Sequence, residues 1–216
     1  MSFFKPLASH KEYFSRHGQL VPYAKGQYLV TSFDDSLWVF YLESGLVRAS
    51  FSFSNGSERL LGYFLPGQTF AQSGSFFRDS GGSLEYVAHE AVRAYRIPRQ
   101  EFLTRLTTDA QFNADYVDLL LRNQIFLIER IVYQGEQHIE HKFLRWLLFM
   151  NKYYGHAVPE GRLIDIAINQ DDIANFLHVT RVSVSKVLKK SCDQGLLRVD
   201  KKRITLLSVD AIQQRL

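Results

Sequence analysis

A change of hydrophobic period near Pro98 constrains the fold of this chain more than any other feature of its sequence. Before this proline, residues 19–97 contain short apolar runs separated by turn signals such as Asn55–Gly56, in which both residues tolerate positive φ. Several short strands at such spacing are typical of a sandwich or barrel. After it, residues 109–137 have apolar side chains at helical spacing and read as one long helix. We therefore predict an α+β chain in which a β-barrel precedes helices.

The long helix is apolar on more than one side, so more than one side must be covered. One side can pack on the barrel, and the other side requires a partner, most simply the same helix of a second chain. The alternative is a helix buried entirely within a monomer. The predicted dimer interface consists of apolar residues along this helix: Phe112, Tyr116, Leu119, Leu120, Phe126, Leu127 and Ile131.

When the segment VTRVSVSKVLKK, residues 179–190, is placed on a helix, its core-forming residues and its surface residues fall on different faces. Val184, Val187 and Leu188 then share one face, at positions i, i+3 and i+4. Thr180 is a suitable N-cap, because its side-chain oxygen can accept from a free N–H group of the first turn. We therefore predict a helix that begins after Thr180 and exposes a polar, basic face.

A second short helix precedes this one, in NQDDIANFLHV (169–179), where Asn169 and Asp172 resemble a capping box. A helix, a short link and a helix with an exposed basic face form the helix-turn-helix pattern of DNA-binding proteins. The runs GLLRVD and RITLLS follow, and they predict two strands around a charged turn at Asp200–Lys202. This hairpin is expected to act as a wing that contacts phosphates.

The charge of the chain supports a nucleic-acid module at its C-terminal end. Residues 142–216 hold 13 of the 26 Lys and Arg residues but 7 of the 22 Asp and Glu residues, a net of +6. Phosphate contacts give affinity, whereas contacts to base edges give specificity. The predicted base contacts are Arg181, Val182, Ser185 and Lys186. The predicted phosphate contacts are Gln170, Thr180, Ser183, Lys189, Lys190, Lys201, Lys202 and Arg203.

A β-barrel, a long helix and a C-terminal winged helix-turn-helix, in this order, resemble the CRP/FNR family of bacterial transcription regulators. The best-matching stretches are residues 36–70 and 169–190. The resemblance implies a cyclic-nucleotide-binding-like jelly roll over residues 1–108, a dimerisation helix over 109–137 and a winged helix-turn-helix over 138–216. It also implies a homodimer on palindromic double-stranded DNA, an effector bound in the barrel and contact with RNA polymerase.

The chain departs from the members of this family that bind cyclic nucleotides. Those members carry a Gly-Glu pair after the Pro-Gly turn and an Arg-Ser or Arg-Thr pair before the next strand. Here the corresponding stretches read FAQSGSFF (70–77) and GGSLEYVAHE (81–90), without that Glu and that Arg. An anionic phosphate without a cation or a helix N-terminus is poorly held. We therefore expect an effector that is not a nucleotide, with a cyclic-nucleotide-responsive or ligand-independent regulator as the alternative.

In overall pattern the chain resembles the halogenated-phenol-sensing regulators of organohalide-respiring bacteria, through its FF-P start, NGSERLLGYF and the recognition helix. Those regulators bind a phenolate with a lysine. This lysine has no clear match on the long helix of the present chain, where Gln124 lies near the corresponding position. The resemblance implies a small, largely apolar or aromatic effector. The implied pocket lining is Phe64, Gln72, Phe76, Tyr86, Leu127 and Tyr133.

No cofactor is expected. An iron–sulfur cluster of the family's oxygen-sensing branch needs several N-terminal cysteines, and Cys192 is the single cysteine of the chain. Haem would need a histidine in the barrel, and His89, the one histidine of residues 19–97, is more typical of a structural residue. His138 and His141 are expected to be solvated, so no metal site is predicted.

Val182 stands where most relatives carry a glutamate that accepts a hydrogen bond from cytosine. A valine cannot accept this bond, but its methyl groups can pack on the C5-methyl group of thymine. We expect each half-site to have A·T where a glutamate-bearing relative has G·C, which gives an AT-rich palindrome. The alternative is a spacer residue without a base contact.

Two other classes of protein compete with this interpretation. A cupin-type barrel enzyme needs a cluster of metal-binding histidines, whereas residues 19–97 hold a single histidine, which argues against an enzyme. The second alternative is a module whose barrel binds a protein partner, but this function does not account for the basic wing. The sequence shows neither a signal peptide nor an apolar run long enough to span a bilayer, and we expect a cytoplasmic protein that has no catalytic residues and no contact with membranes.

Overall fold

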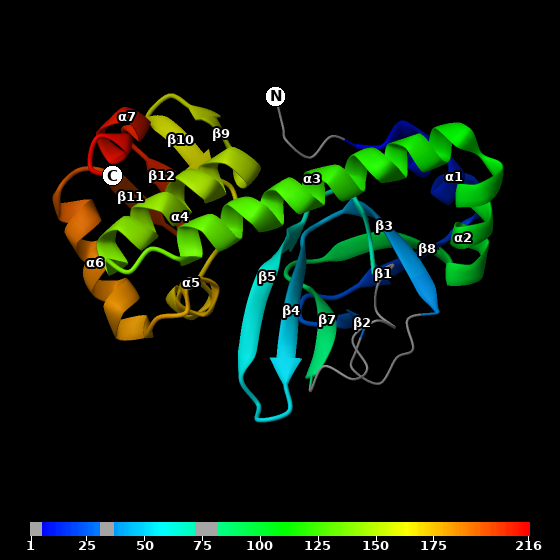
Figure 1. The fold of residues 1–216 in the computed structure, drawn as a ribbon, viewed down its shortest axis with the longest axis horizontal. Coiled ribbons are helices and arrows are strands. Elements are labelled where there is room, and N and C mark those ends of the chain that lie inside the picture. The colour runs from blue at the N-terminus through cyan, green and yellow to red at the C-terminus, as the bar shows by residue number, and fades with distance from the viewer. Residues whose placement is uncertain (1–5, 31–36, 72–81) are drawn as a thin grey trace. The chain divides into compact units, whose positions relative to one another are not determined.

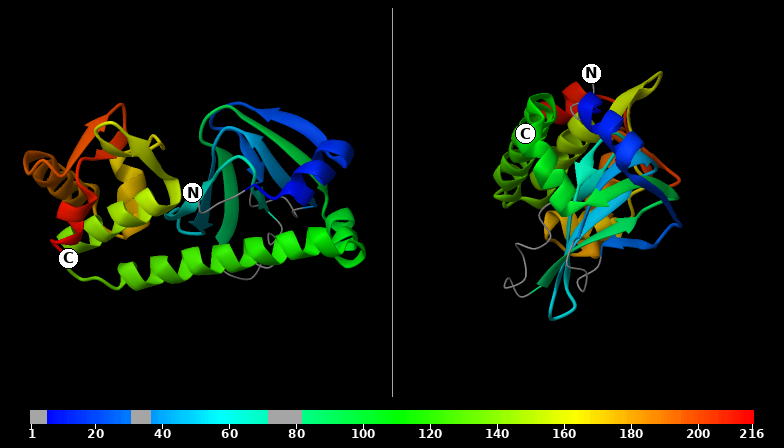
Figure 2. Two further views of the ribbon diagram at one scale, coloured as in Figure 1. Left: turned by 90° about the horizontal axis from the view of Figure 1, so that it is seen from above. Right: turned by 90° about the vertical axis from the view of Figure 1, so that its right-hand side faces the viewer.

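The computed structural model describes residues 6–30, 37–71 and 82–216 (Figure 1). Contacts divide the chain into an N-terminal unit that ends at Arg122 and a C-terminal unit that begins at Asn123. This division falls inside α3 (Ala110–Gln134), whereas the predicted boundaries at 108/109 and 137/138 fall near the two ends of this helix. Figure 2 shows α3 as one unbroken helix. No described helix is long and apolar enough to cross a membrane.

The N-terminal unit contains two four-stranded antiparallel sheets, which confirms the predicted barrel. The first sheet has the order β1-β8-β3-β6, with the strands β1 (Gln19–Tyr23), β8 (Val92–Pro98), β3 (Trp38–Ser44) and β6 (Thr69–Phe70). The second has the order β2-β7-β4-β5, with the strands β2 (Tyr28–Val30), β7 (Gly82–Ala88), β4 (Val47–Phe53) and β5 (Glu58–Phe64). The predicted hairpin at Asn55–Gly56 joins β4 to β5, and Gly56 has a φ of +81° there.

Apolar side chains of both sheets meet in one core. Phe40 and Leu42 come from β3, whereas Ala49 and Tyr86 come from β4 and β7, and all four are almost fully buried. A second cluster lies where α1 (Ala8–His17), α2 (Arg99–Thr108) and the start of α3 pack together with β3 and β8. The members of this cluster are Phe14, Val39, Tyr41, Ile97, Phe102 and Phe112.

His10 of α1 is fully buried and contacts both β6 and α3. Its Nδ1 lies 2.8 Å from Oγ1 of Thr69, and its Nε2 lies 3.1 Å from the carbonyl oxygen of Phe112. Its ring also stacks on Phe112 with centroids 4.0 Å apart. Burial, partly opposed by the Phe112 carbonyl and by Asp115, lowers the pKa of His10 from 6.5 to about 4. The imidazole is therefore neutral in the folded chain at neutral pH.

This neutral histidine predicts acid sensitivity. Between pH 6.5 and 4 the unfolded chain binds a proton that the folded chain does not, so the free energy of unfolding falls as the pH falls through this window. From pH 7 to pH 5 the expected loss is about 2 kcal/mol. Urea unfolding of the wild type and of His10→Gln at both pH values measures it. The variant should be less stable at pH 7 but should lose about 2 kcal/mol less on acidification; equal losses would exclude His10 as the source.

The C-terminal unit consists of helices and a four-stranded antiparallel sheet of order β11-β12-β10-β9. Its strands are β9 (Gly155–Val158), β10 (Gly161–Ile164), β11 (Leu197–Asp200) and β12 (Arg203–Leu206). Its further helices are α4 (Ile139–Tyr154), α5 (Gln170–Leu177), α6 (Arg181–Asp193) and α7 (Val209–Gln213). The predicted wing hairpin, β11–β12, is therefore one half of a larger sheet. Sequence reasoning missed the other half, β9–β10.

The last turns of α3 pack against α4 and α5 within the C-terminal unit. The rings of Phe126 and Phe149 lie 4.8 Å apart. The guanidinium carbon of Arg130 lies 4.2 Å from the ring centroid of Phe176 on α5, and Nε2 of Gln134 donates to the carbonyl oxygen of Phe176 at 3.2 Å. The end of α3 therefore packs against α5, the first helix of the helix-turn-helix.

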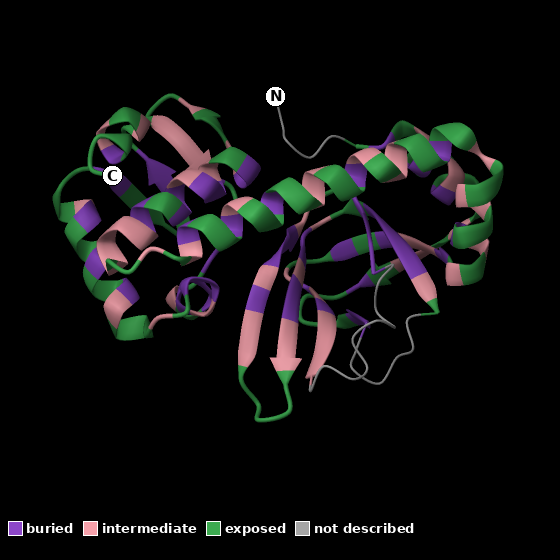
Figure 3. Cartoon of the chain, viewed as in Figure 1, coloured by how far each residue is buried: buried purple, intermediate pink, exposed green. Residues whose placement is uncertain are grey.

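The two faces of α3 differ in exposure (Figure 3). Phe112, Leu119, Phe126 and Tyr133, spaced seven residues apart, are buried within the chain. The large apolar residues elsewhere on the helix are exposed, and this surface is here named the α3 stripe: Val117, Leu120, Leu121, Ile125, Leu127, Ile128, Ile131 and Val132.

The predicted interface residues therefore separate into two groups. Leu120, Leu127 and Ile131 belong to the α3 stripe. Phe112, Leu119 and Phe126 instead lie in the chain's own interior, and Tyr116 packs at the edge of the Phe112 cluster.

Candidate nucleic-acid interface

Two capped helices form the helix-turn-helix, as predicted. The side chain of Asn169 accepts from the backbone N–H of Asp172 at 2.7 Å and caps α5. Helix α5 ends at Leu177, and its C-cap residue His178 has a φ of 58°, in the left-handed region, which turns the chain. The hydroxyl of Thr180 then accepts from the N–H of Ser183 at 3.2 Å and caps α6. Each cap satisfies a backbone donor that the helix cannot, and so fixes where the helix begins.

Helix α6 presents one face to the core and one to the surface. Val184, Val187 and Leu188 are at most 9% exposed and hold the helix against the unit. The residues predicted to read bases, Arg181, Val182, Ser185 and Lys186, are all exposed. Val182 is 63% exposed, although an apolar side chain of this size is stable in a core. Val182 therefore does not contribute to the core beneath α6, and its methyl groups lie at the surface.

A groove of about 440 Å³ brings the start of α5, the start of α6 and the wing together. Gln170 and Asp171 line it from α5, Arg181 from α6 and Lys202 from the wing. Nε of Arg181 lies 3.8 Å from Oδ1 of Asp171, and both side chains are about two-thirds exposed. Polar residues that are more than thirty positions apart thus line one groove, together with the apolar Ile168, Ile173, Leu188, Val199 and Ile204.

The wing ends in a tight turn with an unusual conformation. Asp200 pairs with Arg203, so Lys201 and Lys202 are the two turn residues, with φ values of 45° and 66°. Two-residue hairpin turns of this hand favour Asn-Gly, because a Cβ atom is strained at positive φ. The backbone N–H of Ile168 donates to the carbonyl oxygen of Lys202 at 2.9 Å, which tethers the turn to the segment before α5. The fold thus holds two lysines at the wing tip despite a local strain of about 1–2 kcal/mol per residue.

The predicted phosphate contacts are not equivalent. Nζ of Lys190 lies 2.6 Å from a carboxylate oxygen of Glu140, and Nε of Arg203 lies 2.8 Å from a carboxylate oxygen of Asp165. Within the part of the chain that the structure describes, Lys186, Lys189, Lys201 and Lys202 have no such carboxylate partner. The hydroxyls of Thr180 and Ser183 bond to each other at 2.9 Å at the start of α6. The cations predicted to contact DNA are therefore of two kinds, those without a carboxylate partner among the described residues and those that are partly neutralised.

The adjacent lysines of α6 give a matched test. Each phosphate that loses its cation lowers the steepness of log affinity against log salt concentration by about 0.9. Lys189→Ala removes two such cations from a dimer, so the slope should become shallower by about 2. Lys190→Ala should reduce it by less than half as much, because the ammonium group is already paired with Glu140. Fluorescence anisotropy on random duplex DNA at several salt concentrations measures both slopes. Equal reductions would show that the Glu140 pair does not persist in solution.

The residues predicted to line an effector pocket are distributed over both units of the chain. Phe64 and Tyr86 belong to the barrel core, with ring centroids 5.7 Å apart, and Phe70 lies 5.1 and 5.3 Å from them. Burial raises the pKa of the Tyr86 phenol, so this group stays neutral. Gln72 and Phe76 lie outside the described residues.

The two predicted lining residues on α3 belong to the C-terminal unit. Leu127 is 51% exposed on the α3 stripe. Tyr133 packs within the C-terminal unit, against Phe149 at 5.1 Å and parallel to Phe176 at 6.4 Å. The seven-residue spacing that places Phe126 toward α4 carries Tyr133 to the same side of α3, which explains its location.

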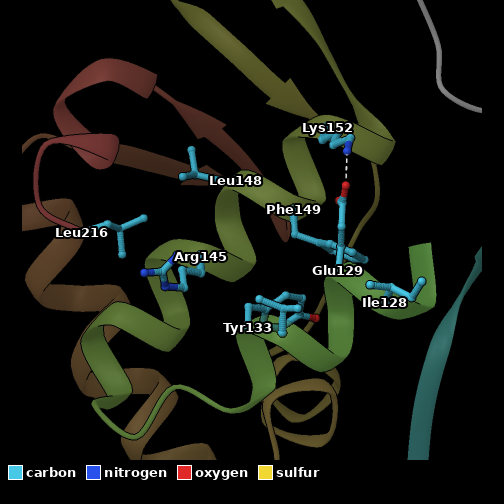
Figure 4. A pocket seen from close by; sticks show the side chains of 9 residues that line it. Ile128, Glu129, Tyr133, Arg145, Leu148, Phe149, Lys152 and Leu216 are labelled. Atoms are coloured by element: carbon cyan, nitrogen blue, oxygen red, sulfur yellow. Dashed lines mark hydrogen bonds and ion pairs between the residues drawn. The ribbon is translucent and has the colours of Figure 1, made fainter. Parts of the chain in front are cut away.

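Tyr133 lines a hollow that sequence reasoning did not foresee (Figure 4). Its volume is about 310 Å³, and its walls come from the end of α3, from α4 and from Leu216. Glu129 forms an ion pair with Lys152 at its rim and accepts from the hydroxyl of Tyr153 at 2.8 Å. Apolar residues at i and i+4 of α3, Ile128 and Val132, line this hollow and also belong to the α3 stripe.

Comparisons with known proteins agree with this architecture. Residues 20–109 match the family model of the cyclic nucleotide-binding domain, and residues 141–215 match that of the Crp-like helix-turn-helix domain. Together these matches cover about three quarters of the chain. The chain belongs to the CRP/FNR family. It is therefore a DNA-binding transcription regulator with a ligand-binding domain, and the prediction that it is not an enzyme is confirmed.

One curated protein and two solved structures are similar to the chain along most of its length. The chain is 22% identical over 199 residues to the global nitrogen regulator of Synechococcus elongatus, across 91% of this chain and 89% of the relative. A CooA mutant from Carboxydothermus hydrogenoformans has the same fold, with a TM-score of 0.79, 19% identity, and coverage of 98% and 95% of the two chains. CprK in complex with OCPA has a TM-score of 0.74, 18% identity, and coverage of 98% and 94%.

Proposed function

We propose that this CRP/FNR-family chain is a homodimeric regulator that binds an AT-rich palindrome and responds to a small effector that is not a nucleotide. The observation that carries the proposal is the exposed face of α6, where Arg181, Val182, Ser185 and Lys186 stand free of the core. A helix of this kind reads base edges in the major groove.

The α3 stripe supports the proposed homodimer. Eight large apolar side chains exposed along one helix form a patch that a monomer rarely leaves in water. A second copy of the same helix covers it with the same chemistry on both sides, and a two-fold axis then relates two copies of α6. Two such helices fit successive major grooves about 34 Å apart.

The base preference rests on the environment of Val182. Its exposed methyl groups can contact a thymine C5-methyl group, whereas Arg181 can donate twice to a guanine. The free lysines Lys189, Lys201 and Lys202 supply phosphate contacts on either side of the recognition face. The site therefore fits half-sites with A·T at the place that Val182 reads.

The effector class rests on the barrel. Phe64, Phe70 and Tyr86 offer aromatic rings and an uncharged phenol. Gly82 begins β7 in the stretch where cyclic-nucleotide binders place their arginine, and a Cβ atom there would lie 2.4 Å from the carbonyl oxygen of Ser52. This crowding leaves no room for a phosphate-binding side chain at that residue. An apolar or aromatic effector suits the barrel better than a cyclic nucleotide.

Helix α3 offers a physical link between effector and DNA. It leaves the N-terminal unit and ends against Phe176 of α5, through Arg130 and Gln134. An effector that shifts α3 would change the packing at the helix-turn-helix. Contact with RNA polymerase, as the family resemblance implies, is part of the same proposal.

Selection of bound sequences from a random duplex pool tests the proposal. Without added ligand, the expected product is an AT-rich palindrome with half-sites one helical turn apart. If nothing is enriched, the selection is repeated with aromatic and halogenated aromatic compounds and with cyclic AMP. Enrichment only with cyclic AMP would contradict the proposed effector class, and enrichment under no condition would contradict sequence-specific binding.

A further inference from the structure

Gln124 is a polar residue in the middle of the α3 stripe. Its helical neighbours at i−4, i−3, i+3 and i+4 are Leu120, Leu121, Leu127 and Ile128, which are 43%, 54%, 51% and 52% exposed. Residues at these spacings share one helix face. The amide of Gln124 is itself exposed, so it is surrounded by leucine and isoleucine on a surface without other polar groups at these positions.

The spacing along the stripe is that of a coiled-coil seam. Val117, Leu121, Gln124, Ile128 and Ile131 follow one another in steps of four, three, four and three residues. This is the alternation of the a and d positions of a heptad, which face a partner helix. The buried face of α3, with Phe112, Leu119, Phe126 and Tyr133, lies on the other side. Gln124 is therefore the single polar residue among five consecutive seam positions.

We propose that Gln124 sets the register of the dimer, by pairing with the same residue of a second copy across the two-fold axis. This inference rests on the proposed homodimer. A side-chain amide carries both donors and an acceptor, so two copies can bond to each other. When the seam closes, an amide opposite leucine or isoleucine would lose its water without gaining a partner, which is unfavourable. A slipped pair of helices therefore binds less tightly than a pair in which both amides meet.

Charge substitution is the first test. Gln124→Glu places two carboxylates against each other at the axis and should weaken the dimer about 100-fold or more. Gln124→Leu should leave the dimer as tight as the wild type or tighter, because it removes a polar group from an apolar seam. Gln213→Glu, at an exposed position on α7, is the charge-matched control and should have no effect. Analytical ultracentrifugation gives the dissociation constants.

Disulfide trapping tests the geometry directly. In a Cys192→Ser background, Gln124→Cys and Ile131→Cys are each oxidised with glutathione disulfide, and linked dimers are separated on non-reducing gels. In a parallel, in-register pair both positions meet their own copies within the distance a disulfide can bridge, so both link. In an antiparallel pair centred on Gln124, only Gln124→Cys links. The exposed Gln213→Cys should stay unlinked.

The outcomes separate this inference from the proposed function. A dimer that links at both positions and dissociates with Gln124→Glu supports the register role. If the wild type is a dimer but the Gln124→Cys variant does not link, or the dimer tolerates Gln124→Glu, the role of Gln124 is overturned and the homodimer stays intact. A wild-type chain that stays monomeric at high concentration overturns the homodimer itself, and the register role with it.

Discussion

Ile128→Glu is expected to lower the affinity for a palindromic operator at least about 100-fold, because it should abolish the dimer. Ile128 is 52% exposed and occupies the seam next to Gln124. In a two-fold pair the substitution would bury two carboxylates without partners and would remove two apolar side chains from the interface. An unpaired charge in such surroundings costs several kcal/mol. A monomer then presents a single α6 and can bind only one half-site.

The measurement combines sedimentation with fluorescence anisotropy on the selected palindrome. Ile128→Leu keeps the apolar volume and should retain both the dimer and the affinity. Circular dichroism should show the same helix content for all variants, because the Ile128 side chain is about half exposed. A dimer that withstands Ile128→Glu would show that the α3 stripe is covered by something other than a second copy.

The helix-turn-helix could be predicted in detail because its signals are local. Asn169 and Thr180 cap their helices through bonds to residues three positions ahead, and the apolar spacing of α6 places Val184, Val187 and Leu188 inside. Such relations depend on the helix alone and not on what packs against it. The same holds for the hairpin at Asn55–Gly56.

The faces of α3 could not be assigned from sequence for the opposite reason. The helix is apolar on both sides, and periodicity shows that two stripes exist without showing which of them the chain itself covers. Phe112, Leu119 and Phe126 were predicted to face a partner but lie inside, whereas Leu120, Leu127 and Ile131 are exposed. The seven-residue spacing of the three buried residues was a signal that they share one face, but only tertiary packing shows where it points.

Charge pairing is equally hidden from sequence. Lys190 and Arg203 belong to basic runs, yet they meet Glu140 and Asp165 across 50 and 38 residues of chain. A count of cations therefore overstates the charge available to DNA. Strands β9 and β10 were missed because each has four residues, too few for an alternating pattern to stand out, although Pro159 between them was a usable turn signal.

Val182→Glu is expected to move the preferred base pair from A·T toward G·C at one position of each half-site. The exposed valine offers methyl groups to thymine, whereas a glutamate at this place can accept from the amino group of cytosine. A wrong base pair typically costs about 1–3 kcal/mol, roughly additively for separate positions. For the two half-sites of a dimer, the change in preference should thus amount to about 30-fold or more.

Competition binding between two palindromes that differ only at this base pair measures the change. Val182→Ala is the matched control: it removes methyl groups without adding an acceptor, so it should weaken the preference for A·T and gain none for G·C. Because neither substitution touches Lys189, Lys201 or Lys202, binding to random DNA should fall only slightly for glutamate, through its added charge, and should not change for alanine. If Val182→Glu lowers affinity for both palindromes equally, Val182 is a spacer on α6, and the preference of the site must come from Arg181 and its neighbours.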